Sequence, residues 1–263
     1  YDHADIFHDL AAIRAQFHNL VRMLPENAVV VYPLEDEEIQ AVISMGCWTR
    51  LEPFSAIEGE WTISEANKGF CNFSVKNNEK EVGSVKWSTI GEHNAMNALA
   101  AVIAAKNIGI PVDKACEALS KFKSVKRRLE CIYALKGIRI YDDFAHHPTA
   151  IRESLKALRS ASEDGRIIAI IEPRSNTMRM GVHAEALPEA FLDADLVYFF
   201  QPDDLSWNID EYMGELGSRC QVFMDVDKIV NTICNDIKDK DQIIIMSNGA
   251  FNGVHRKIIE RLS

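Results

Sequence analysis

The chain has 263 residues, of which 47% are hydrophobic and 26% are charged, and its formal net charge is −10. This is an ordinary globular composition, and the length is enough for two domains. The acidic charge argues against a general nucleic-acid-binding or membrane-surface protein, and the apolar runs are too short to span a bilayer.

The first half of the sequence mixes helical patterns with strands that look antiparallel. In chain order, the predicted elements are a helix at 9–24, a buried strand at 28–32, a helix at 37–45, a hairpin of strands at 69–77 and 81–88, an Ala-rich helix from 91 to about 106, and a helix from about 111. Trp61 and Trp87 are expected to close the apolar face of the hairpin. The polar stretch 121–128 is the predicted junction between a domain at 1–122 and a domain at 123–263.

In the second half, short runs of Ile and Val alternate with helical patterns. The predicted strands are 138–141, 166–171, 196–200, 220–223 and 242–246, and the predicted helices are 149–158, 183–191, 209–216, 226–237 and 252–262. This alternation predicts an α/β domain with a mainly parallel sheet that is covered on both faces. Such sheets bind ligands beyond the carboxyl ends of their strands, so functional residues are expected near Asp143, Arg174 and Ser247.

The segment Tyr-Asp-Asp-Phe-Ala-His-His-Pro-Thr at 141–149 follows a predicted strand and precedes a helix that Pro148 suits as its first residue. A polar loop that caps one helix is the simpler interpretation. One cap does not require two carboxylates and two imidazoles, so Asp143, His146 and His147 are candidate site residues.

Further candidates lie at the domain junction and near helix starts. Asn94 and Asn97 stand three positions apart beside His93, and side-chain amides match the edge of an adenine, whereas capping by Asn94 would explain only one of them. Arg128 can bind phosphate, although a solvated linker charge explains it equally well. His3, next to an aspartate, could bind a divalent cation, and an exposed helix entry is the alternative.

Two loops follow predicted strands with similar chemistry. Arg174, Ser175 and Asn176 come directly after the strand at 166–171, and a guanidinium with short polar groups suits recognition of a carboxylate. Ser247 and Asn248 repeat the arrangement after the last strand, where a plain strand-to-helix turn is the alternative.

These clusters, in this order, resemble the Mur ligases, the ATP-dependent amide-bond-forming enzymes of peptidoglycan metabolism. The resemblance rests on Asp-His-Ala-Asp-Ile-Phe at 2–7, Met-Gly-Cys-Trp at 45–48, the segment 141–149, Glu-Pro-Arg-Ser-Asn-Thr-Met at 172–178 and Met-Ser-Asn-Gly at 246–249. It covers the whole chain and implies part of the family's central ATPase domain followed by its Rossmann-like C-terminal domain. The segment 172–178 is most similar to the branch that joins the tripeptide L-Ala-γ-D-Glu-meso-diaminopimelate to UDP-N-acetylmuramate in peptidoglycan recycling.

The resemblance also implies a role for each candidate. His3 would bind the catalytic Mg²⁺, Asp143 would hold the ribose hydroxyls of ATP, and His146 and His147 would lie near the reacting centre. The adenine pocket would be lined by His93, Asn94 and Asn97, with Arg128 reaching the nucleotide as a catalytic cation. The incoming tripeptide would be bound by Arg174, Ser175, Asn176, Ser247 and Asn248.

The implied ligands are ATP, Mg²⁺, UDP-N-acetylmuramate and the tripeptide, with no nucleic acid or membrane partner. The alternatives are a UDP-N-acetylmuramate–L-alanine ligase of the same family and a catalytically silent module that binds a peptide or nucleotide. The sequence begins without Met and contains no Gly-x-x-x-x-Gly-Lys-Ser/Thr phosphate loop, so it is expected to be a fragment that lacks the N-terminal UDP-binding region and is inactive alone. Its six scattered cysteines form no Cys-x-x-Cys pair and fit reduced thiols in a cytoplasmic protein.

Overall fold

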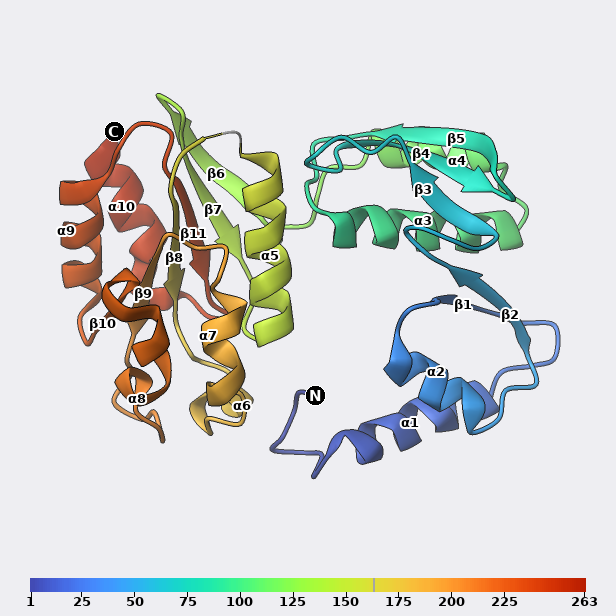
Figure 1. The fold of residues 1–263 in the computed structure, drawn as a ribbon, viewed down its shortest axis with the longest axis horizontal. Helices are drawn as coiled ribbons and strands as arrows, with labels where there is room; N and C mark the ends of the chain where they lie inside the picture. Colours follow the sequence, from blue (N-terminus) through green and yellow to red (C-terminus); the bar gives the residue numbers. More distant parts are fainter. Residues whose placement is uncertain (163) are drawn as a thin grey trace. The chain divides into compact units, whose positions relative to one another are not determined.

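The computed structural model describes residues 1–162 and 164–263, which form two compact units. Figure 1 shows the helices and strands of each unit. Tyr1 and Ile6–Lys123 make up the first unit, and Asp2–Asp5 groups with Ser124–Ser263 in the second. The chain passes from one unit to the other inside the polar stretch 121–128. Within the described residues, no helix is both long enough and apolar enough to cross a membrane.

The first unit is built on a five-stranded sheet with the order β1–β2–β3–β4–β5. Its elements are α1 (Leu10–Arg22), β1 (Val29–Pro33), α2 (Glu37–Ser44), β2 (Arg50–Phe54), β3 (Trp61–Ser64), β4 (Asn72–Asn77), β5 (Lys80–Lys86), α3 (Glu92–Asn107) and α4 (Val112–Ser120). The predicted helices and hairpin are confirmed. The strands β1 to β3 pair in parallel, so the expectation of antiparallel strands is correct only from β3 to β5.

The apolar core of this unit joins α3 to the sheet. Leu99 of α3 is fully buried, Trp61 is buried beside it in the same cluster, and Trp87 packs edge-on against Phe73. Both tryptophans therefore close the apolar face as expected. The strand predicted to be buried at 28–32 is only half-buried apart from Tyr32, because β1 is an edge strand of the described sheet.

A buried carboxylate, Glu52, organises the polar side of this core. Its Oε1 accepts hydrogen bonds from Trp61 Nε1 at 3.0 Å and Lys106 Nζ at 2.7 Å, and its Oε2 accepts one from Asn107 Nδ2 at 2.7 Å. Burial by itself raises the pKa of this carboxyl. The hydrogen bonds from Lys106, Asn107 and Trp61 together outweigh burial, so the pKa of Glu52 lies below its ordinary value of 4.5.

Glu52→Gln is expected to lower the free energy of unfolding of the first unit by about 2 kcal/mol at neutral pH, because Lys106 and Asn107 lose their charged acceptor. A carboxyl with a depressed pKa in the folded state contributes stability above pH 4.5 that is lost as the pH falls through the folded-state value. The effect should therefore be full above pH 4.5 and shrink below it. Urea unfolding over that range measures it, with the exposed Glu58→Gln as a neutral control. A pH-independent difference would contradict the explanation.

The second unit carries a six-stranded sheet with the order β10–β9–β8–β11–β7–β6. Its elements are β6 (Glu130–Leu135), β7 (Ile138–Asp143), α5 (Pro148–Ala161), β8 (Ile167–Ile171), α6 (Asn176–Arg179), η1 (Ala184–Ala186), α7 (Leu187–Ala190), β9 (Leu196–Phe200), α8 (Ile209–Met213), η2 (Gly214–Arg219), β10 (Cys220–Phe223), α9 (Val226–Asp236), β11 (Gln242–Met246), η3 (Phe251–Gly253) and α10 (Val254–Leu262). All neighbouring strands are parallel except β6, which is antiparallel to β7. In Figure 1, α5 lies on one face of the sheet and α9 and α10 lie on the other, which confirms the predicted α/β domain.

Some predicted helices of this unit are interrupted. The helix predicted at 183–191 is divided into η1 and α7, because Pro188 has no N–H to continue an earlier helix and stands at the start of a new one. The helix predicted at 209–216 ends at Met213, where Gly214 begins a short 3₁₀ segment that includes Gly217 at φ 53°. The strand β6 and the short helix α6 are not predicted at all.

The strand order brings three polar segments to one edge of the sheet. β11 lies between β7 and β8, and Met246 pairs with Asp143 on one side and with Ile171 on the other. Every residue of β8 and β11 is buried, as expected for central parallel strands that helices cover on both faces. The residues that follow β7, β8 and β11 therefore emerge side by side at the carboxyl edge.

Candidate functional site

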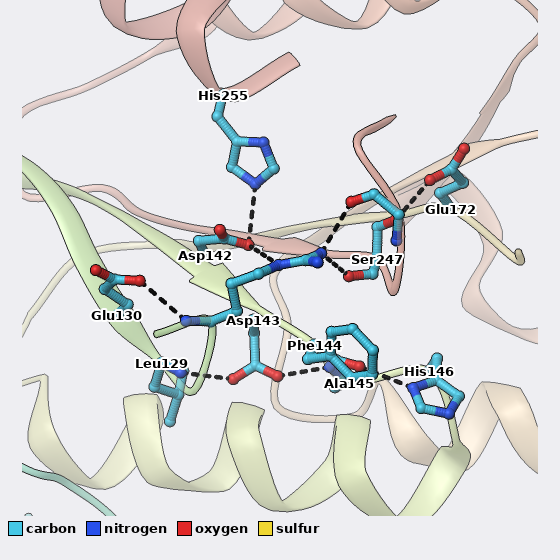
Figure 2. A network of polar contacts seen from close by, with 12 residues as sticks. Leu129, Glu130, Asp142, Asp143, Phe144, Ala145, His146, Glu172, Ser247 and His255 are labelled. Carbon is cyan, nitrogen blue, oxygen red and sulfur yellow. Dashed lines mark hydrogen bonds and ion pairs between the residues drawn. The ribbon is translucent and has the colours of Figure 1, made fainter. Parts of the chain in front are cut away.

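A network of polar contacts fills this carboxyl edge of the second unit (Figure 2). The side chain of Arg127 donates from Nη2 to the carbonyl oxygens of Ser247 and Gly249, the second at 2.9 Å, and its Nε lies 3.5 Å from Asp142 Oδ1. The guanidinium also lies over the Phe144 ring, 4.9 Å from its centre. Arg127 thus ties the segment before β6 to the end of β7 and to the loop after β11.

Asp142 has a second partner in α10. Its Oδ1 is 3.2 Å from His255 Nε2. Burial lowers the pKa of His255 below 6.5, and the charge of Asp142 acts against that shift. The side chain of Asp142 therefore connects Arg127, at the domain junction, to His255 in α10.

Asp143 is buried, and its side chain points away from solvent. Leu129 N donates to Oδ2 at 2.8 Å, Ala145 N donates to Oδ1 at 2.7 Å, and Ser154 Oγ lies 3.3 Å from Oδ2. Burial raises the pKa of Asp143, although these hydrogen bonds and the charge of Arg128 act in the opposite direction. Asp143 thus holds the positive-φ turn at Leu129 against the loop that carries the two histidines.

The loops after β8 and β11 are joined through Glu172. Ser247 Oγ donates to Glu172 Oε2 at 2.5 Å and accepts from Gly249 N at 2.9 Å. Arg174 extends across Gly249, where an added Cβ would lie 2.4 Å from Arg174 Cδ, so a larger residue there would displace the arginine side chain. Arg174 keeps 48% of its side chain exposed. Asn248 Oδ1 is buried and has no hydrogen-bond partner within the described part of the chain.

The two histidines after β7 have different surroundings. His146 Nδ1 lies 2.8 Å from the carbonyl oxygen of Phe144, and its Nε2 is 3.5 Å from Asp2 Oδ2. His147 is the N-cap of α5, and its Nδ1 accepts from Thr149 N at 3.2 Å. The ring of His147 also packs on that of His183, with 4.4 Å between the ring centres. His147 therefore has a structural role at the start of α5, whereas His146 lies in a loop held by Asp143.

The segment Asp2–Asp5 lies against α6. Ala4 N donates to Thr177 Oγ1 at 3.3 Å, and Asn176 Nδ2 donates to Asp5 Oδ2 at 2.8 Å. Ser175 is the N-cap of α6 and accepts from Met178 N. Two of the residues predicted to bind a substrate, Ser175 and Asn176, thus shape α6 and hold the N-terminal segment.

His3 is exposed and stands at φ 58°. Asp2 Oδ2 lies 4.0 Å from His3 Nε2, and hydrogen bonds from the backbone of His3 and from Thr177, with the charge of His146, lower the pKa of Asp2 although burial raises it. Among residues 1–162 and 164–263, no three His, Cys, Asp or Glu side chains gather so as to hold a metal ion. The described residues therefore do not form a complete Mg²⁺ site by themselves.

In the first unit, the candidate residues lie at the start of α3. The N-cap is Gly91, at φ 98°, and Asn94 Nδ2 donates to the carbonyl oxygen of Ile90 at 2.7 Å. Capping by Asn94, the alternative considered from the sequence, is therefore not what the helix uses. Asn97 is exposed one turn further along the same side, and His93 is half-buried.

The predicted site residues leave out three residues of the network: Arg127, Glu172 and His255. Arg127 and its neighbour Arg128 cannot be told apart from the sequence. In the structure Arg128 is exposed, and its guanidinium lies 5.7 Å from the centre of the Phe144 ring. Glu172 opens the segment 172–178 and could have been found from its position at a strand end. His255 lies inside α10, where no local pattern marks it.

The fold and these contacts define an α/β protein with a Rossmann-like second unit and a polar network at the carboxyl edge of its sheet. The family model described as "Mur ligase middle domain" matches residues 1–105, and that described as "Mur ligase, glutamate ligase domain" matches residues 127–249. The chain belongs to the Mur ligase family and carries its middle and C-terminal domains.

Similar proteins come from more than one branch of this family, and those named UDP-N-acetylmuramate–L-alanine ligase are 24–33% identical to this chain. A curated protein of Haemophilus influenzae named UDP-N-acetylmuramate–L-alanyl-γ-D-glutamyl-meso-2,6-diaminoheptandioate ligase is 39% identical over 263 residues, which are 100% of this chain and 58% of that protein. The protein of the same name from Escherichia coli is 39% identical over 264 residues, with the same shares covered. The crystal structure of a murein peptide ligase from Psychrobacter arcticus has a TM-score of 0.70 and 38% identity, covering 97% of this chain and 55% of that one. The chain thus spans a little over half the length of these relatives.

Proposed function

We propose that this chain carries two domains of an ATP-dependent ligase that joins the tripeptide L-Ala-γ-D-Glu-meso-diaminopimelate to UDP-N-acetylmuramate in peptidoglycan recycling. The observation that carries the proposal is the 39% identity, over the whole chain, to curated relatives named for these substrates. In this reaction ATP converts a carboxylate into an acyl phosphate, and the free α-amine of the peptide displaces phosphate to form the amide. Phosphoryl transfer of this kind needs positioning and charge neutralisation more than covalent catalysis.

We propose nucleotide-binding residues in each of the two domains. In the first unit, His93, Asn94 and Asn97 line the adenine pocket. This is supported by the exposed amide of Asn97 and by the amide of Asn94, which donates from Nδ2 to the carbonyl oxygen of Ile90 and also carries an acceptor oxygen. In the second unit, Arg128 neutralises phosphate charge, which its exposed guanidinium supports.

Asp143 remains the proposed partner of the ribose hydroxyls. A carboxylate accepts about four hydrogen bonds, and three positions are used by Leu129, Ala145 and Ser154. At most one position remains for a ribose hydroxyl, on a side chain that is only 3% exposed. The stronger contribution of Asp143 is therefore to hold the loop that carries the histidines.

We propose that His146, rather than His147, accepts the proton that the attacking amine loses. The neutral imidazole of His146 can donate from Nδ1 to the Phe144 carbonyl, which leaves Nε2 with a lone pair to take up a proton beside the carboxylate of Asp2. His147 uses the lone pair of Nδ1 to cap α5, so its Nε2 carries the hydrogen in the neutral ring. Nε2 of His147 is therefore not a base.

The tripeptide is proposed to bind at the loops after β8 and β11. The half-exposed guanidinium of Arg174 suits a peptide carboxylate, and the buried Oδ1 of Asn248 offers an acceptor to a donor group of the ligand. Ser247, bonded to Glu172, holds this loop in shape. Ser175 and Asn176 act through α6 and the segment Asp2–Asp5.

Mg²⁺ and the cytoplasmic location belong to the same proposal. The metal would enter with ATP and neutralise its phosphates, and His3 is the proposed protein ligand, to be completed by groups outside the described residues. The cytoplasmic assignment rests on the six free cysteines, a state typical of reducing compartments.

The complete gene product that contains these residues is expected to release ADP when it is given ATP, UDP-N-acetylmuramate and the tripeptide. L-alanine in place of the tripeptide should give no more ADP than the reaction without acceptor. A coupled assay of ADP with these three acceptor conditions measures this. A response to L-alanine alone would overturn the proposal in favour of the L-alanine ligase, and no response to either acceptor would favour a silent binding module.

The 263 residues by themselves should bind ligands without ligating them, because the sequence contains no phosphate loop to hold the triphosphate. The same assay with this chain serves as the control. ATP-dependent ligation by it would refute the assignment of the phosphate loop to another part of the protein.

A further inference from the structure

A cavity of about 620 Å³ opens beyond the carboxyl ends of β9 and β10, next to the site described above but formed by other residues. Leu205, Trp207 and Met224 contribute apolar walls, and Asn208 and Asp210 contribute polar groups. Asp210 supplies the charge of this lining, so the cavity suits a cationic group on an apolar stem. Its volume is in the range of small-ligand sites.

The cavity shares a wall with the proposed peptide-binding loop. Trp207 Nε1 donates to the carbonyl oxygen of Met178 at 2.7 Å, and Ser206 N donates to that of Arg179 at 3.1 Å. A Cβ on Gly181 would lie 2.8 Å from the Trp207 ring, so the indole packs closely on the turn after α6. These contacts fix one side of the cavity against α6, which begins directly after Arg174 and Ser175. Figure 1 shows α6 and α8 at the same end of the sheet.

The spacing of the strands relates the cavity to the length of a peptide. Ile171 at the end of β8 pairs with Phe199, and Phe199 pairs with Val222 of β10. Neighbouring strands are about 4.8 Å apart, so the end of β10 lies about 10 Å from the end of β8. An extended peptide advances about 3.3 Å per α-linked residue and further across the γ-link of D-Glu, so a tripeptide is long enough to cover this distance.

We propose that this cavity binds the third residue of the incoming peptide and selects a side chain whose distal carbon carries an ammonium group. In meso-diaminopimelate the same carbon also carries a carboxylate, which in this arrangement points away from Asp210. The inference rests on the proposed function and adds to it the residues that would recognise the third residue of the tripeptide. Methylenes of the side chain pack on Trp207 and Met224, and the ammonium lies beside the carboxylate of Asp210. Arg179 does not compete for this place, because its Nη1 is held by Asp204 Oδ2 at 2.7 Å.

Calorimetric titration of this chain with two tripeptides tests the inference. Both peptides begin with L-Ala-γ-D-Glu, and the third residue is meso-diaminopimelate in one and 2-aminopimelate, which lacks the distal amine, in the other. The diaminopimelate peptide should bind about tenfold more tightly, as expected for one hydrogen-bonded ion pair. Asp210→Asn should remove this difference by weakening only the diaminopimelate peptide. Glu211→Gln, a neighbouring acid on α8 that does not line the cavity, should leave both affinities unchanged.

A second variant tests the volume rather than the charge. Met224 is 71% exposed, so Met224→Trp should fold while filling the cavity. It should weaken both tripeptides at least about tenfold and leave the dipeptide L-Ala-D-Glu unaffected, since one side chain's apolar burial is lost. Equal affinity of the two tripeptides for the original chain, or equal weakening of both by Asp210→Asn, would overturn the inference. Discrimination at Asp210 without ligation by the complete gene product would remove the proposed function alone, whereas ligation that ignores the third residue would remove the cavity's role alone.

Discussion

His146→Ala is expected to lower the rate of amide formation by the complete gene product about 10²- to 10⁴-fold, the range for loss of a general base. The loop geometry is the reason. The Phe144 carbonyl orients the ring through Nδ1, and Asp2 stands 3.5 Å from Nε2, where it favours the imidazolium that forms when the amine loses its proton. The single-turnover rate of amide formation, measured across pH, should lose the limb that belongs to this base. ATP binding should be unchanged.

His147 provides the matched control for His146. His147→Asn keeps a side-chain acceptor for Thr149 N at the N-cap of α5 and should leave the rate near that of the original protein. His147→Ala should cost about 1 kcal/mol of stability through loss of the cap, again with little change in rate. If His147→Asn abolished the pH limb and His146→Ala preserved it, the two roles would have to be exchanged.

Arg127→Ala is expected to reduce the free energy of unfolding of the second unit by about 3 kcal/mol. The substitution removes the donors to the Ser247 and Gly249 carbonyls and leaves Asp142 without its cation. Contact with the Phe144 ring is lost as well. Urea unfolding would measure the loss of stability. Hydrogen exchange of the native protein would show whether the loop after β11 loses protection.

Arg128 is the internal comparison, since it is the next residue and carries the same charge. Its side chain is exposed, so Arg128→Ala should change stability by less than about 1 kcal/mol and should instead weaken nucleotide binding by the complete gene product. Equal destabilisation by both substitutions would contradict the division of labour between the two arginines.

Most of the second unit could be predicted from the sequence because its strands carry their own signal. Runs such as Ile167–Ile171 are apolar throughout, since both faces of a central parallel strand are covered, and the polar residues that follow them mark the strand ends. The strand β6 was not predicted because an edge strand needs no continuous apolar run. α6 escaped because it spans only the four residues Asn176–Arg179 and forms no periodic pattern.

The placement of the candidate residues was predicted better than the contacts that they make. That residues near Asp143, Arg174 and Ser247 converge follows from parallel strands alone, and the register of β7, β8 and β11 bears it out. The inward direction of Asp143 depends on where Leu129 N and Ala145 N lie in three dimensions, which no local pattern encodes. The same holds for the choice between Arg127 and Arg128. The two arginines are adjacent and chemically identical, and only Arg127 donates hydrogen bonds to the carbonyl oxygens of the loop after β11.

The place of β11 in the sheet has a consequence for biosynthesis. β11 comes last in the sequence among the six strands of this sheet, yet it lies between β7 and β8. The strands β7 and β8 therefore cannot pair with their shared neighbour until β11 has been synthesised. Nascent chains that have not yet exposed Gln242–Met246 therefore hold an unfilled gap at the middle of the sheet. Products truncated before this strand should therefore be substrates for proteolysis.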